Sequence, residues 1–75
     1  MSFNVGSMID SIGSKQSSVN DMMSGLAGIE DPAEMLKASF ELMKEQQKLT
    51  IMNESFNKTM KASHDAQKEA IKSMN

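Results

Sequence analysis

The side chains best suited to chemistry in this chain of 75 residues lie together in its last third. His64 is the only histidine, and it stands between Ser63 and Asp65. Neighbouring residues of a helix point about 100° apart, so these three side chains do not form a nucleophile with its base. We therefore predict that the protein is not an enzyme.

Two pairs of carboxylates, four residues apart, provide the other candidate chemistry. Glu41 with Glu45, and Asp65 with Glu69, would each share one helix face. Such pairs resemble half of a metal site in a helical bundle, but the Glu-x-x-His pattern that supplies the other half is absent. The chain has no cysteine and no glycine-rich phosphate loop, so we expect no bound metal and no cofactor.

The charge balance excludes further classes of function. The chain has eight lysines, no arginine and ten acidic residues, which is unfavourable for binding nucleic acid. No apolar run approaches the ~18 residues that cross a bilayer, so we expect no membrane insertion. The first positive charge is Lys15, and polar residues interrupt the apolar ones before it, so we expect no cleaved signal peptide.

The junction at residues 29–34 marks where one predicted helix ends and the next begins. Asp31 can accept free backbone N–H groups of a helix, Pro32 suits the first helical position, and Glu34 can complete a capping box. Gly28 suits a left-handed cap for the preceding helix. No Gly or Pro follows Pro32, so we predict one all-α domain over residues 1–75. It is a two-helix hairpin with helices over about 4–28 and 32–74 and a turn at 29–32.

The first helix is predicted from an apolar stripe at helical spacing, although glycine and serine are frequent in the same segment. Lys15 takes the one polar place in this stripe. The stripe consists of Val5, Met8, Ile12, Val19, Met22, Leu26 and Ile29. A second stripe is made of small residues, namely Gly6, Gly13, Ser17, Ser24 and Gly28. The alternative is a flexible polar leader, because each interior glycine costs a helix about 1 kcal/mol relative to alanine.

The second helix carries a heptad-like seam, with apolar residues every seven places and others three places on. These residues are Met35, Leu42, Leu49 and Phe56, then Ala38, Met52 and Ala66. A neighbouring apolar line consists of Leu36, Phe40, Met43 and Ile51. One short helix covers one line, so another chain should cover the second; the alternative is one wide face on a single partner. We expect the hairpin and its copies to pack through Val5, Ile12, Val19, Leu26, Met35, Leu42, Leu49 and Phe56.

These features resemble the filament subunits of bacterial type III secretion systems, which comprise needle proteins and, as relatives in role, inner-rod and Hrp pilus proteins. The closest resemblance is Asp31-Pro32-Ala33-Glu34-Met35-Leu36 followed by Phe40, which is similar to the segment that opens the long helix of needle proteins. Asn53-Glu54-Ser55 and Met60-Lys61 resemble a second patch of the same pattern. The overall plan covers the whole chain, and the matching residues cover 31–61.

Two departures from the needle pattern bear on the choice within this group. Needle proteins commonly carry tyrosine near the middle of the long helix, where this chain has residues 45–48 and no tyrosine at all. Their C-termini are often more apolar than residues 62–75. A chain without tyrosine and rich in methionine, serine and lysine leans toward an Hrp-type pilus subunit, and both assignments stay open.

The resemblance implies a hollow helical homopolymer that conducts unfolded effector proteins into host cells. Its implied partners are the base and inner rod of the secretion system, its tip proteins and the transported effectors. It implies secretion to the cell surface without a cleaved signal. The long helix would line the channel, which makes candidate lumen residues of Lys58, Lys61, Asp65, Lys68 and Lys72. The alternative for these charged residues is a solvated outer stripe. The alternatives for the function are an inner-rod or adaptor protein of the same machine and a small two-helix binding module such as a chaperone.

Overall fold

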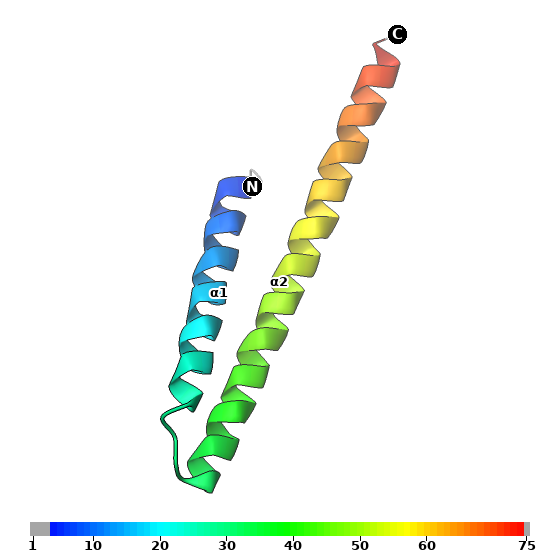
Figure 1. The fold of residues 1–75 in the computed structure, drawn as a ribbon. Helices are drawn as coiled ribbons and strands as arrows, with labels where there is room; N and C mark the ends of the chain where they lie inside the picture. Colours follow the sequence, from blue (N-terminus) through cyan, green and yellow to red (C-terminus); the bar gives the residue numbers. More distant parts are fainter. Residues whose placement is uncertain (1–3, 75) are drawn as a thin grey trace.

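A computed structural model describes residues 4–74 and shows the predicted all-α hairpin (Figure 1). Helix α1 is Val5–Leu26 and helix α2 is Pro32–Ser73. The molecule is a thin rod with extents of 66 × 20 × 16 Å. The predicted hairpin of a short helix followed by a long one is confirmed; α1 ends two residues earlier than expected, so the connection covers residues 27–31.

The ends of α1 differ from the prediction in two respects. Asn4 caps its N-terminus, because the Asn4 side chain accepts a hydrogen bond from the Ser7 N–H at 3.1 Å. The expected left-handed cap at Gly28 is wrong, since no glycine among residues 4–74 has a positive φ. The helix ends instead in right-handed conformation at Ala27, and the Gly28 N–H donates to the Gly25 carbonyl at 3.3 Å in a tightened last turn.

Helix α2 begins at the predicted junction, but the cap works through the backbone. Asp31 stands at the N-cap in extended conformation, and Pro32 follows as the first helical residue. The Asp31 carbonyl accepts the first helical hydrogen bond from the Met35 N–H at 2.9 Å. The predicted side-chain cap at Asp31 is wrong, because its exposed carboxylate makes no cap hydrogen bond and stays in solvent. Glu34 lies in the first turn, where the positive helix end favours an acid.

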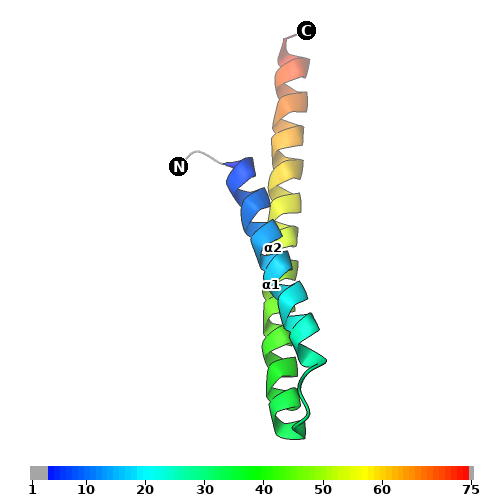
Figure 2. The ribbon, with the colours of Figure 1, turned by 60° about the vertical axis from the view of Figure 1, so that its left-hand side comes forward.

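The two helices lie against each other over only part of α2. Figure 2 shows α1 crossing the lower part of α2, while the upper part of α2 projects alone. Thr59 is the last residue of α2 that is not exposed, and residues 60–74, which we call the overhang, are exposed throughout. Three side chains are buried in the described hairpin, namely Val19, Leu42 and Leu49. So small a core gives the free chain little stability.

We therefore expect the isolated chain to be less helical than the assembled protein. The two glycines inside the first half of α1 weaken that helix, and Val19 is the one buried residue of α1. Circular dichroism on dilute monomer should show a clear loss of helicity relative to assembled material at the same concentration. Equal helicity in both states would show that α1 needs no second chain.

Candidate functional site

The seam between α1 and α2 brings together the residues that the heptad pattern predicts. Val19 is 2% exposed, Leu42 is 9% exposed and Leu49 is 8% exposed. Ile12, Met22 and Leu26 pack against this cluster, and the other predicted packing residues are half-buried. The half-buried packing residues are Val5, Ile12, Leu26, Met35 and Phe56. All eight lie along the seam of one hairpin, so contacts between copies need further surfaces.

An ion pair crosses this apolar seam, and the sequence prediction missed it. The Lys15 ammonium donates to a Glu45 carboxylate oxygen at 2.6 Å, with side chains 28% and 19% exposed. Lys48 donates to the other oxygen of Glu45 at 3.3 Å. Lys15 takes the one polar place in the apolar stripe of α1, and Glu45 comes three residues after Leu42, in the heptad place of Ala38 and Met52. Two opposite charges in facing seam positions favour the register in which they meet, since a slip would separate them.

The same contacts set the pH dependence of the hairpin. The pKa of Glu45 is lowered, chiefly by the hydrogen bond from Lys15 and then by that from Lys48. Because the folded pKa is lowered, this stabilisation is complete above the usual glutamate pKa of about 4.3. It is lost as the pH falls through the lowered pKa of Glu45.

We expect acid to destabilise the wild-type hairpin more than the Glu45→Gln variant. Thermal melts by circular dichroism at pH 7 and near pH 3 should show a larger drop in midpoint for the wild type. Glu41→Gln is the matched control, because Glu41 is exposed and forms no ion pair within residues 4–74. If Glu45→Gln and the wild type lose the same midpoint on acidification, the seam ion pair does not stabilise the fold.

One flank of the hairpin carries no charge and combines exposed apolar side chains with uncharged polar ones. Side chains just after the seam residues of both antiparallel helices fall on the same side of the pair. We call this the uncharged flank. On α1 it comprises Gly6, Ile9, Gly13, Gln16, Asn20, Met23 and Ala27; on α2 it comprises Leu36, Ser39, Met43, Gln46, Thr50 and Asn53. Ile9, Met23, Leu36 and Met43 are each at least 50% exposed.

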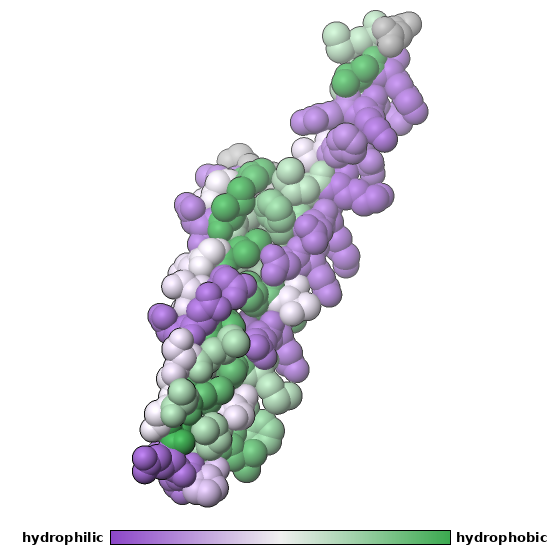
Figure 3. All heavy atoms as spheres, viewed as in Figure 1, coloured by the Kyte–Doolittle hydropathy of each residue, from purple (hydrophilic) through white to green (hydrophobic). Residues whose placement is uncertain are grey.

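Figure 3 shows hydrophobic surface spread over the part of the molecule where α1 and α2 lie together. Phe40, at 56% exposed, borders the flank on α2, and Ile51, at 62%, lies on the outer side of that helix. The predicted second apolar line is therefore uncovered by α1. This excludes the alternative of one wide face covered by a single helix of the same chain.

The overhang divides lengthwise into an uncharged half and a charged half. Successive side chains turn by about 100°, which places all its ionisable residues on one arc. The uncharged face, which continues the line of the seam, comprises Met60, Ala62, Ser63, Ala66, Gln67, Ala70, Ile71, Ser73 and Met74. The charged face comprises Lys61, His64, Asp65, Lys68, Glu69 and Lys72. Figure 3 shows hydrophilic surface along this upper part of α2.

The predicted lumen residues share this charged face, and Lys58 continues it toward the hairpin. All of them are exposed. Lys61 pairs with Asp65 at 3.4 Å, and Lys72 pairs with Glu69 at 3.9 Å. Exposed pairs of this kind contribute at most about 1 kcal/mol, so this face is a solvated, mixed-charge surface and not a packing surface.

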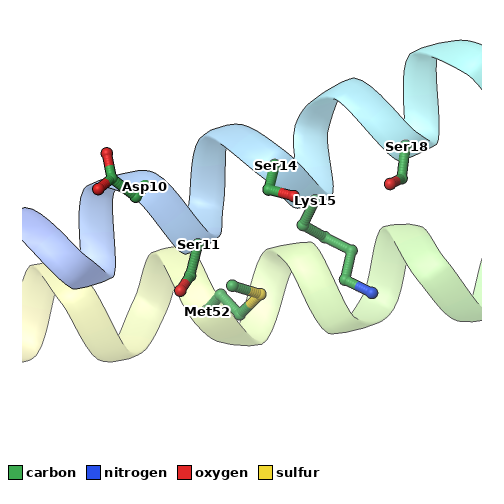
Figure 4. Close-up of a pocket in the computed structure, with 6 residues that line it drawn as sticks. All are labelled: Asp10, Ser11, Ser14, Lys15, Ser18 and Met52. Carbon is green, nitrogen blue, oxygen red and sulfur yellow. The ribbon is translucent and has the colours of Figure 1, made fainter.

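An open groove lies on the other flank, where serines border the seam. It has a volume of about 440 Å³ and is lined by Asp10, Ser11, Ser14, Lys15, Ser18 and Met52. Figure 4 shows the Lys15 side chain extended from α1 toward α2, and Ser11 and Met52 side by side. Because the one cationic group in this lining is already bound to Glu45, the groove offers no free positive charge for a ligand.

The side chains that could take part in catalysis or bind a metal ion do not come together in one site within residues 4–74. Ser63, His64 and Asp65 are exposed on the overhang, and Asp65 binds Lys61. Glu45 binds two lysines, while Glu41 points into solvent. In this part of the chain no three potential ligands gather as they would around a metal ion. Neither described helix has a stretch long and apolar enough to cross a membrane.

Comparison of the chain with protein-family models, with curated proteins and with solved structures gave no match, so the resemblance to type III secretion filaments stays a prediction.

Proposed function

We propose that this protein is the subunit of a type III secretion needle or Hrp-type pilus, a hollow helical homopolymer that conducts unfolded effector proteins into host cells. The observation that carries the proposal is the uncovered apolar surface of the hairpin. Leu36, Phe40, Met43 and Ile51 are each more than half exposed, on a rod that buries three side chains in residues 4–74. Exposed apolar lines of this extent mark sites of association.

The charged face of the overhang supports the conducting role. It presents lysines beside acids, so its charges of both signs keep the surface wet. An unfolded chain passing such a wall finds little apolar surface to adhere to. In this proposal α2 lines the channel through Lys58, Lys61, Asp65, Lys68 and Lys72, and α1 lies outward.

The partners follow from the same proposal. The subunit binds further copies of itself, the base or inner rod at one end of the filament, tip proteins at the other, and effectors in transit. It reaches the cell surface by the secretion system itself.

Negative-stain microscopy of purified protein, combined with sedimentation, tests this function. We expect long, thin, hollow filaments that pellet, with a small soluble fraction. Short assemblies of few copies would favour an inner-rod or adaptor protein of the same machine. A defined soluble dimer, with no filament at any concentration or pH tried, would contradict the proposal and favour a two-helix binding module.

A further inference from the structure

Two uncovered surfaces of the described chain have matching character and lie at different ends of the rod. One is the uncharged flank, between residues 6 and 53, and the other is the uncharged face of the overhang, between residues 60 and 74. Both lack any Lys, Asp or Glu, and both expose large apolar side chains. Met43 and Ile71, one on each surface, are 51% and 62% exposed.

From this pairing we infer that the overhang of one copy packs into the uncharged flank of the next copy, forming a three-helix contact that repeats without closing. The inference rests on the proposed self-assembly and names the two surfaces that carry it. The overhang continues the seam face of α2 past the N-terminal end of α1 (Figure 2). It therefore presents to a neighbour the same side on which α2 binds α1 within the hairpin.

The charges favour a second copy over other occupants of the flank. A nucleic acid, an anionic lipid surface or a charged peptide needs opposite charges, and this flank has none. The overhang buries no charge when it enters, because all its ionisable residues lie on the opposite arc and stay in water. The same contact leaves the Lys61–Asp65 and Lys72–Glu69 pairs exposed.

The dimensions fit as well. The overhang of residues 60–74 is about 22 Å long, and the flank follows α1 for about 33 Å at 1.5 Å per residue. One helix laid along this flank buries less than the ~800 Å² per partner of a stable isolated complex. A single contact should therefore be weak, and each copy inside a filament makes it twice.

Whether the assembly stays open or closes depends on the two contacting surfaces being different. A contact between unlike surfaces builds an open filament, with one surface of each kind free at its two ends, when the rotation between copies does not close a ring. A two-fold contact of flank on flank would close into a dimer and leave the apolar face of the overhang exposed in every copy. The head-to-tail contact covers both surfaces with one interaction.

Cysteine cross-linking between full-length copies tests the contact, because the chain has no cysteine of its own. The Met43→Cys variant is mixed in turn with Met60→Cys, Ala66→Cys or Ile71→Cys, allowed to assemble, and oxidised. A disulfide needs the two Cα atoms within about 7 Å, so only adjacent surfaces react. Lys61→Cys, on the charged face, is the matched control, and circular dichroism checks that each variant is helical.

We expect at least one of the three mixtures to give a mixed disulfide several-fold above either homodimer and above the Lys61→Cys control. Filaments that form without any such enrichment would overturn this contact and leave the proposed function standing. A dominant homodimer of Met43→Cys would overturn it in favour of the two-fold arrangement. Absence of any assembly would overturn the proposed function and this contact together.

Discussion

Replacing Leu49 with Asp is expected to abolish assembly and to lower the helicity of the free chain. Leu49 is 8% exposed in the seam, and Lys15, the cation that enters the seam, is already bound to Glu45. Burying an unpaired charge costs several kcal/mol, which exceeds the stability that three buried side chains can supply. Leu42→Asp should act in the same way. The measurements are circular dichroism and a sedimentation assay of assembly.

Lys44→Glu is the matched control for this substitution. Lys44 is exposed and lies on the outer side of α2, away from the seam. This variant should keep its helicity and still assemble, although it also changes a charge. A Leu49→Asp protein that folds and assembles like the wild type would show that the seam does not hold the hairpin together.

A second large effect is expected in the chemical accessibility of the overhang. If its charged face lines a channel, cysteines introduced by Lys61→Cys or Lys68→Cys should react with a bulky maleimide at least tenfold more slowly in intact filaments than in dissociated subunits. Ser7→Cys, on exposed α1, should react at similar rates in both states. Ser2, in the same N-terminal segment of the sequence, lies outside the described residues.

One labelling result would contradict the channel assignment. Rapid labelling of Lys68→Cys along the whole length of intact filaments would place the charged face outside, as an ordinary solvated surface. Charge reversal at Lys61 and Lys68 extends the test, because it should reduce effector passage while assembly is kept.

The hairpin could be predicted because its signals are local. Pro32 opens a helix that no later Gly or Pro interrupts, and the spacing of Leu42 and Leu49 is that of a heptad seam. Val19 follows from the apolar stripe of the first helix. These residues form the described core, since one short helix against one long one leaves few alternative pairings.

The details of the helix ends and the seam charge were not predicted. The choice between Ala27 and Gly28 as the end of α1, and between side chain and backbone at Asp31, depends on differences of about 1 kcal/mol that residue types do not resolve. The Lys15–Glu45 pair needs the relative register of the two helices, because its partners are far apart in the chain. The sequence does carry a sign of this pair, because Lys15 and Glu45 are charged residues at seam positions of the two helices.

Which uncharged surfaces remain uncovered could not be predicted from the sequence either. The sequence shows two apolar lines on the long helix, but only the position of α1 decides which is covered. The structure also shows that α2 is covered no further than Thr59, which leaves the overhang bare. The second line and the overhang then become the surfaces available to other copies.

Electron cryo-microscopy of assembled protein, reconstructed to show its cross-section, tests whether α2 lines a channel. We predict a hollow tube in which α2 surrounds the channel, its charged face turned inward, while α1 lies on the outside and each overhang packs on a neighbouring copy. A solid filament, or a tube lined by α1, would contradict it.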